Sequence, residues 1–333
     1  MQRTICVYLG DALADYNFGP SHPFGPQRYR AFEAELRARG LDRRVRIRAP
    51  QQAGREVLER FHDPAYVAEV IARSPTGSGA LDCGDTPAFP GMYEAAATVV
   101  GTTVAALEQV MTGPCRRAFV PIAGLHHARR DGAAGFCIFN DCGVAIESLR
   151  RVYGIRRVAY VDIDAHHGDG VYYGFADDPD VIIADVHEDG RFLYPGTGAA
   201  DERGTGKAKG SKCNVPLPPH ADDSAFRQAW PEIERFLDRN APEVVLLQCG
   251  ADSVAGDPIT HLRFSPETHR FVTERLCRLA DRHAGGRMLV MGGGGYDPAR
   301  LAETWCIVLE QLIRCDAGAE GRPGPAEDAQ GSA

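Results

Sequence analysis

The chain has 333 residues, 44% of them hydrophobic and 25% charged, which is a composition typical of globular proteins. Its formal net charge of −8 argues against nucleic-acid binding, because proteins that neutralise phosphates usually present a basic surface. No apolar run approaches the ~18 residues of a membrane-spanning helix, and the N-terminus lacks the apolar core of a signal peptide. We therefore expect a cytoplasmic protein that binds neither nucleic acid nor membranes.

Short apolar runs alternate along the chain with longer segments of helical pattern. Nearly continuous apolar strands are typical of a parallel sheet that is covered on both faces. The alternation predicts a single α/β domain over residues 1–315 with a mostly parallel sheet. The predicted strands are 4–9, 118–122, 158–164, 181–187, 244–250 and 288–293, and the predicted helices are 26–40, 92–111, 139–153, 225–239 and 267–283.

The C-terminal residues 316–333 are rich in glycine, proline, alanine and acidic residues, which predicts a disordered tail.

The ten cysteines form no CxxC pair, and several of them lie in apolar runs. We interpret them as buried free thiols and expect no thiolate metal site.

Polar clusters follow five of the predicted strands. In open α/β sheets, ligands bind in the crevice beyond the carboxyl ends of the strands, so these clusters are expected to meet at one site. The clusters are GLHHARR after residue 122, DIDAHHGDG from 162, VHEDGR from 186, GADSVAGDP from 250 and GGGGYDP from 292.

The second cluster contains candidate metal ligands. Asp164 and His166 are two residues apart, so on an extended segment their side chains point the same way. Carboxylate and imidazole groups are ordinary zinc ligands, and a catalytic zinc commonly has three protein ligands and a water. Asp252 is the candidate third ligand because it also follows a strand. The alternative interpretation is a hydrogen-bonded strand end without metal.

His126 and His127 form a second candidate group. A histidine pair on a surface often has no function, but here Asp162 and Asp169 are available as partners. A carboxylate that accepts a proton from one ring nitrogen sets the tautomer of an imidazole and raises its basicity. Two histidines oriented in this way beside a metal would form a general acid/base apparatus.

Tyr296 follows four glycines, residues 292–295. This run lacks the spacing of a phosphate-binding loop, whereas glycines readily form a sharp turn close to a ligand. Such a turn would present the Tyr296 hydroxyl to a developing oxyanion. A packed tyrosine without this role is the alternative.

Taken together, these motifs resemble the zinc-dependent histone deacetylase superfamily over most of the chain, from about residue 17 to about residue 312. The resemblance lies in GLHHARRDGAAGFCIFND, VDIDAHHGDGV, LYPGTG, GADSVAGDP and GGGGY, which occur in the order typical of that superfamily. The branch that the chain most resembles is that of the bacterial acetoin-utilisation-type (AcuC-like) deacetylases. This likeness lies in HPFGPQR, GDTPAFPGMYEAA and VHEDGRFLYPGTG. Acetylpolyamine amidohydrolases are more distant relatives.

The resemblance implies an arginase-like three-layer α/β/α fold and a set of catalytic roles. It places Zn²⁺ on Asp164, His166 and Asp252, and it pairs His126 with Asp162 and His127 with Asp169. His127 becomes the general base and acid, and Tyr296 polarises the substrate carbonyl.

It also implies further binding residues. Gly135, Phe136 and Gly294 would contact the acyl-lysine chain, Asp85 would hold the substrate backbone at the rim, and Arg28 would lie in a channel for departing acetate. Structural potassium is implied at two places. The first set is Asp162, Asp164, His166, Asp185 and Val186, and the second is Phe175, Asp178 and Val181.

Some positions depart from the superfamily pattern. Asp185 stands where a serine is frequent, which puts the first potassium site in doubt, and Gly25 replaces a frequent lysine in the entrance loop. His167 and His187 match positions outside the metal shell, and we interpret both as structural.

The implied reaction is hydrolysis of an acetyl amide, with the acetylated lysine of a protein as the substrate that the AcuC-like resemblance favours. Acetylpolyamines or other small acyl-amines are the alternative, because acidic groups near the rim could attract a cation; these are Asp82, Asp85, Glu188 and Asp189. The same ligands would accept Fe²⁺ in place of Zn²⁺.

Two further alternatives are disfavoured by particular residues. A binuclear manganese ureohydrolase would need acids where Gly168 and Val254 stand. A non-catalytic acyl-lysine binder would be expected to lack a metal ligand or the tyrosine, and both are present.

Overall fold

The computed structural model describes residues 5–319, which form one eight-stranded sheet with every neighbouring pair parallel. The strand order is β2-β1-β3-β8-β7-β4-β5-β6. The predicted α/β class with a mostly parallel sheet is confirmed. The strands are β1 (Ile5–Tyr8), β2 (Arg46–Arg48), β3 (Arg117–Val120), β4 (Val158–Asp162), β5 (Val181–Glu188), β6 (Lys212–Leu217), β7 (Val244–Gln248) and β8 (Met288–Met291).

The sequence-based prediction missed the two strands at the edges of the sheet. β2 is three residues long with two arginines, and β6 contains Pro216 and the polar Asn214. Edge strands need neither two apolar faces nor a complete set of backbone donors, so they lack the continuous apolar run of interior strands. The six predicted strands all lie at interior positions.

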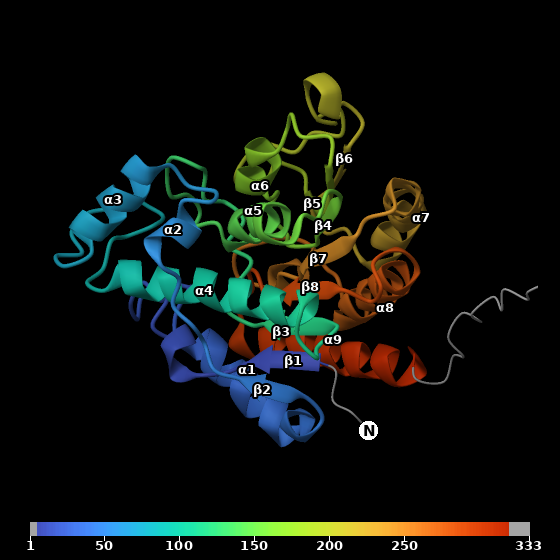
Figure 1. Cartoon of the computed structure of the whole chain (residues 1–333), viewed down its shortest axis with the longest axis horizontal. Helices are drawn as coiled ribbons and strands as arrows, with labels where there is room; N and C mark the ends of the chain where they lie inside the picture. Colours follow the sequence, from blue (N-terminus) through green and yellow to red (C-terminus); the bar gives the residue numbers. More distant parts are fainter. Residues whose placement is uncertain (1–4, 320–333) are drawn as a thin grey trace, which may run out of the picture.

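Helices cover both faces of the sheet (Figure 1). On one face α4 packs against α5, β3 and β8; on the other, α9 packs between α1 and α8, while α7 and α8 contact β5, β6 and β7. None of the helices in the described range is both long and apolar enough to cross a membrane. The helices are α1 (Gln27–Ala38), α2 (Arg55–Leu58), α3 (Pro64–Arg73), α4 (Met92–Met111), α5 (Asp141–Tyr153), α6 (Asp169–Gly174), α7 (Asp223–Asn240), α8 (Pro266–His283) and α9 (Pro298–Ala319).

The helix α9 was not predicted from the sequence, although Trp305 and its apolar neighbours are buried against the rest of the core. It runs to Ala319 and thus includes residues 316–319, the first four of the predicted tail. The remainder of that predicted tail, 320–333, lies outside the described residues.

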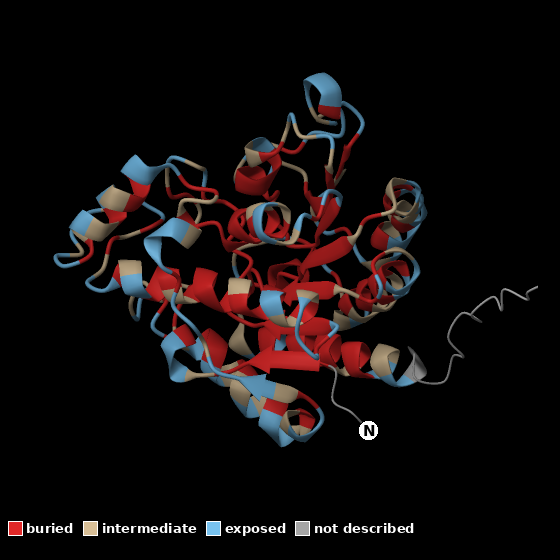
Figure 2. Cartoon of the chain, viewed as in Figure 1, coloured by how far each residue is buried: buried red, intermediate tan, exposed pale blue. Residues whose placement is uncertain are grey.

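Figure 2 shows the sheet buried throughout its centre, with exposed residues on the outer surfaces of the helices.

The expectation that all ten cysteines are free was wrong for one pair. Cys6 on β1 and Cys115 just before β3 form a disulfide with a Cα–Cα distance of 5.9 Å. β1 and β3 are neighbours, with Cys6 opposite Ala118, so the sheet brings together two residues that are 109 positions apart. The other eight cysteines are free.

The five strands that precede the polar clusters, β3, β8, β7, β4 and β5, are consecutive in the sheet. Because all of them are parallel, their carboxyl ends lie along one edge, and the five clusters lie side by side.

Candidate active site

The predicted metal ligands Asp164, His166 and Asp252 lie together and are buried. Nδ1 of His166 lies 3.1 Å from a carboxylate oxygen of Asp164 and 3.1 Å from one of Asp252. One ligand atom from each residue lies within 4.8 Å of the other two. Two residues come from the loop after β4 and the third from the loop after β7, which is the neighbouring strand.

Backbone and side-chain donors orient the two carboxylates. The second oxygen of Asp164 accepts hydrogen bonds from Gln248 Nε2 at 2.7 Å and from the Gly294 amide at 2.8 Å. One oxygen of Asp252 accepts from the amide of Ala165 at 2.9 Å. A Cβ at Gly294 would lie 2.1 Å from the Asp252 carboxylate, so only glycine permits this approach.

The electrostatics of this cluster fit a divalent cation. Burial, together with the nearby charge of Asp164, raises the pKa of Asp252 to about 7. Within the described residues, neither carboxylate forms an ion pair with a lysine or arginine. Buried charges of like sign are costly unless a cation balances them. Two carboxylates and an imidazole converging on one point are a suitable donor set for such an ion.

The histidine pair has the partners predicted for it. Nδ1 of His126 lies 2.8 Å from Asp162, Nδ1 of His127 lies 2.6 Å from Asp169, and the two Nε2 atoms face each other at 3.0 Å. Each carboxylate therefore accepts a proton from Nδ1, and at most one proton lies between the two Nε2 atoms. Asp169 is the first residue of α6, and Asp162 ends β4.

The two imidazoles have opposite pKa shifts. Burial lowers the pKa of His126, but the carboxylates of Asp162 and Asp164 outweigh this effect and raise it to about 10. Burial and the positive charge on His126 lower the pKa of His127 to about 4. His127 is therefore the neutral member of the pair at pH 7, with an unprotonated Nε2.

Two residues that the sequence analysis left without a role hold the histidine segment in place. Asn140 donates from Nδ2 to the carbonyl oxygens of His126 and Ala128 at 3.2 and 2.8 Å. Asp141 accepts from the amides of Gly124 and Leu125 at 3.0 and 2.7 Å. Both belong to the FND part of a quoted motif, but their partners can be recognised only in three dimensions.

Tyr296 lies on the turn after β8, and its position depends on two charged residues. The carboxylate of Asp257 accepts from the Tyr296 amide at 2.7 Å. Arg28 is fully buried; it donates to the carbonyl oxygens of Gly295 and Gly293 at 2.7 and 2.5 Å and has one Nη without a partner. Arg28 therefore lies beneath the turn that carries Tyr296, and its role in an acetate channel stays a prediction.

His127, His166 and Tyr296 open onto a hollow of about 250 Å³. Gly135 and Phe136 line it as predicted, and a Cβ on Gly135 would lie only 2.6 Å from the His127 ring. Gly294 instead lies behind the carboxylates that it helps to orient. Three lining residues were missed by the sequence analysis. The full lining is Asp85, His127, Gly135, Phe136, His166, Leu193, Tyr194, Ile259 and Tyr296.

Of the four acids predicted near the rim, only Asp85 lines this hollow. Asp82 accepts from the amide and hydroxyl of Thr86 within its own loop. Glu188 is buried against His261, with a carboxylate-to-Nδ1 distance of 2.7 Å. Asp189 forms an ion pair with Arg191 at 2.6 Å. The expected acidic rim is therefore reduced to one carboxylate.

At both predicted potassium sites, some of the groups predicted to bind the ion have other partners in the structure. Nζ of Lys212 already donates to the carbonyl oxygens of Asp178 and Val181, two of the three groups predicted to bind potassium. At the first site, Asp185 lies 2.6 Å from Nδ1 of His187 and accepts from the Gly168 amide. An ammonium and an imidazole thus take up oxygen atoms that potassium would need.

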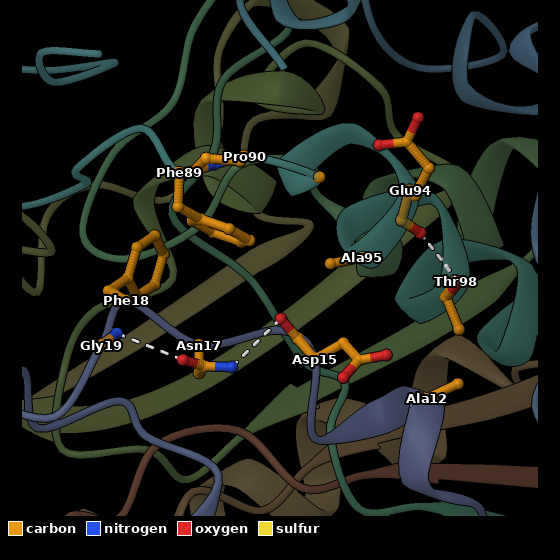
Figure 3. Close-up of a pocket in the computed structure, with 11 residues that line it drawn as sticks. Ala12, Asp15, Asn17, Phe18, Gly19, Phe89, Pro90, Glu94, Ala95 and Thr98 are labelled. Atoms are coloured by element: carbon orange, nitrogen blue, oxygen red, sulfur yellow. Dashed lines mark hydrogen bonds between the residues drawn. The ribbon is translucent and has the colours of Figure 1, made fainter. Parts of the chain in front are cut away.

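A second hollow of about 590 Å³ is lined by residues from the segments 12–19 and 89–98 (Figure 3). Phe18 and Phe89 form one wall, and the carboxylates of Asp15 and Glu94 point away from them. The Asn17 side chain is hydrogen-bonded within its own loop. None of the predicted catalytic residues lines this hollow.

Comparison with known proteins identifies the family. Residues 22–312 match the model of the histone deacetylase domain. The chain belongs to the histone deacetylase family. It is similar in structure to a solved HDA15 HD domain, with a TM-score of 0.87 and 26% identity, covering 94% of this chain and 90% of that one.

Among curated relatives, the acetoin utilization protein AcuC of Bacillus subtilis is 36% identical over 97% of this chain and 85% of its own length. A histone deacetylase-like amidohydrolase of Pseudomonas aeruginosa is 34% identical, with coverages of 87% and 77%. Histone deacetylase RPD3 of Saccharomyces cerevisiae is 32% identical, with coverages of 92% and 71%. These findings confirm the predicted resemblance, including its AcuC-like branch.

Proposed function

We propose that this protein is a zinc-dependent amidohydrolase that removes the acetyl group from acetyl-lysine side chains in proteins and releases acetate. The observation that carries this proposal is the opening of the His166 cluster, His127 and Tyr296 onto one hollow. Membership of the histone deacetylase family supports the reaction class. Zinc is our first choice because three ligands of this type with an open position are usual in catalytic zinc sites, and Fe²⁺ suits the same donors.

When bound by the carboxylate–imidazole cluster, such an ion would act as a Lewis acid toward the acetyl carbonyl and toward a water. His127 is the general base in this proposal. Its Nδ1 donates to Asp169, so Nε2 is the nitrogen that would accept the proton of the attacking water, in exchange for its 3.0 Å contact with Nε2 of His126. The resulting imidazolium then gives that proton to the amine as the C–N bond breaks. His126, held by Asp162, sets the charge beside His127.

Tyr296 supplies the second stabilising group for the developing oxyanion. Burial and the nearby charge of Asp252 raise the pKa of the Tyr296 hydroxyl, so it stays protonated and can donate a hydrogen bond. The Asp257 bond to its backbone and the buried Arg28 below hold the turn in place before substrate binds. A preorganised donor of this kind is worth most when negative charge develops on the carbonyl oxygen.

The rim supports acetylated protein lysine over a cationic polyamine as substrate. A free polyamine carries further ammonium groups, which would gain from several unpaired acids around the entrance. Only Asp85 remains unpaired there, because Glu188 and Asp189 have partners of their own. An exposed carboxylate at the mouth can instead accept hydrogen bonds from the backbone amides of a peptide.

The test compares kcat/KM of the zinc-loaded protein for an acetyl-lysine peptide, N-acetylputrescine and N-acetylcadaverine. We expect a clear preference for the peptide. A preference for the diamines would assign the protein to acetylpolyamine hydrolysis with the same chemistry. Zinc-loaded, folded protein that hydrolyses none of them would contradict the proposed function.

A matched pair of variants examines the role of the rim. Asp85→Asn should lower kcat/KM for the peptide by about tenfold, since a hydrogen bond to a charged group contributes roughly 1.5–3 kcal/mol. Asp15→Asn, in the second hollow, should leave it unchanged. Equal effects of the two substitutions would remove Asp85 from substrate binding.

A further inference from the structure

Lys212 is a buried lysine whose ammonium donates its hydrogen bonds to neutral oxygen atoms. It begins β6 and is 0% exposed. Its Nζ donates to the carbonyl oxygen of Val181 at 2.7 Å, to that of Asp178 at 2.8 Å, and to the hydroxyl of Ser211 at 2.8 Å. All three ammonium protons therefore have acceptors. No carboxylate of the described residues forms an ion pair with this group.

This arrangement is unusual for a buried ammonium, which is normally paired with an acid. The nearest candidate, the carboxylate of Asp178, forms its ion pair with Arg150 instead. Converging backbone carbonyls are the ligands that proteins use to replace the hydration shell of potassium. The oxygen atoms around the ammonium of Lys212 are thus of the kind that would coordinate a small monovalent cation.

Position 212 carries a lysine in a chain whose basic residues are almost all arginines. Only three of the 37 lysine and arginine residues are lysines, and the other two, Lys207 and Lys209, are exposed. A planar guanidinium fork suits carboxylates, whereas a compact ammonium can direct its donors to three separate oxygens. Burial lowers the pKa of Lys212 to about 8, so the ammonium form still predominates at pH 7.

The contacts of Lys212 tie together three elements. These elements lie toward the β6 edge of the sheet (Figure 1). Asp178 lies in the connection from α6 to β5, Val181 begins β5, and Lys212 begins β6. The other end of α6 is Asp169, which holds the general base His127. The ammonium thereby holds in place the connection that follows α6.

We propose that Lys212 serves as a built-in monovalent cation, and that removing its side chain would open a site for an exchangeable one. The carbonyl oxygens of Asp178 and Val181 would then be free to bind potassium or a small alkylammonium ion. The proposal is independent of the substrate and of the metal at His166.

The test uses the full chain with Lys212→Ala and, as a matched control, Lys212→Met, which keeps an apolar stem in the space. The melting temperature is measured at constant ionic strength in potassium, ethylammonium or choline chloride. Lys212→Ala should melt lower than wild type in choline and recover saturably, by roughly 5 °C, in potassium or ethylammonium. Wild type and Lys212→Met should show no such additional recovery.

Two results would overturn the proposal. One is folded Lys212→Ala protein whose response to the cations equals that of wild type. The other is a Lys212→Met protein as stable as wild type, because an uncharged side chain would then satisfy the site equally well; this result remains decisive if Lys212→Ala does not fold. Thallium bound between Asp178 and Val181 in crystals of Lys212→Ala, but not of wild type, would locate the opened site directly.

Discussion

Two groups of oxygen atoms, at opposite ends of neighbouring strands, differ in whether the chain itself supplies a lysine or arginine cation to them. After β4 and β7, the carboxylates of Asp164 and Asp252 converge on His166 without a lysine or arginine partner among the described residues. At the opposite, amino-terminal ends of β5 and β6, the carbonyl oxygens of Asp178 and Val181 already accept hydrogen bonds from the ammonium of Lys212. The first group, which we call the open group, could bind a cation from solution. The second, which we call the closed group, already contacts a cation that belongs to the chain.

Asp185 and His187 on β5 belong with the closed group. Nδ1 of His187 lies 2.6 Å from Asp185, and Nε2 lies 2.9 Å from the carbonyl oxygen of Gly198. Both ring nitrogens face acceptors, so the bonds are complete only when the imidazole is protonated. The comparison shows that ion sites expected from a family resemblance must be checked in each chain. A lysine or histidine side chain of the chain itself can already contact the oxygen atoms that would bind the ion.

The largest expected effect is at the open group. Asp252→Ala should lose its bound metal and lower kcat by roughly 10³-fold or more, since a Lewis acid contributes several kcal/mol to the barrier reduction. Metal content of the dialysed protein and turnover are measured together, with circular dichroism to verify folding. Full retention of metal would place the third ligand elsewhere.

Tyr296→Phe separates chemistry from metal binding. Loss of one oxyanion donor should lower kcat by roughly 10²–10³-fold. The metal content should stay at the wild-type value, because Tyr296 is not among the cluster residues. Tyr153→Phe, at the end of α5, is the control. Turnover within tenfold of wild type would exclude this role for Tyr296.

Gln248→Met tests whether the open group is held in place by its neighbours. Gln248 Nε2 donates to Asp164 at 2.7 Å, and methionine removes this bond at similar volume. Loss of such an orienting partner should weaken zinc affinity about 10–100-fold. The same change on α9, Gln311→Met, should leave affinity unaltered. An unchanged dissociation constant in a competition titration for Gln248→Met would show that the carboxylate needs no such support.

The smallest expected effect is at the closed group, and it depends on pH. Burial lowers the pKa of His187, but the charge of Asp185 outweighs it, so the pKa is raised overall. A raised folded-state pKa means that the stabilisation is complete below the ordinary value of about 6.5 and is lost as pH rises through the folded-state value. His187→Asn should therefore cost more free energy of unfolding at pH 6 than at pH 9, by on the order of 1 kcal/mol. A larger cost at pH 9, from denaturant unfolding, would contradict a charged imidazole.

Much of the fold could be predicted because interior parallel strands carry continuous apolar runs. β4 and β7 were recognised in this way, and the polar residues directly after them, including Asp164 and Asp252, came together as the parallel topology requires. The edge strand β6 could not be recognised, because its proline and half-exposed positions resemble a loop.

Residues whose roles depend on contacts between distant segments were not predictable from local pattern. Gln248 contacts Asp164 across 84 positions, and Asp257 reaches Tyr296 across 39. Lys212 lies in the polar run KAKGSK and has the appearance of a surface lysine in the sequence. Only the packing of the α6–β5 connection against β6 buries its ammonium and brings the carbonyl oxygens to it.

The central claim is that one divalent ion, held by Asp164, His166 and Asp252, supports the hydrolysis of acetyl-lysine. It is tested most directly by titrating metal-free protein with Zn²⁺ while measuring turnover of an acetyl-lysine peptide. We expect no turnover without metal, and a rise that levels off at one equivalent. Full turnover by metal-free protein, or a rise that continues to two equivalents, would contradict the claim.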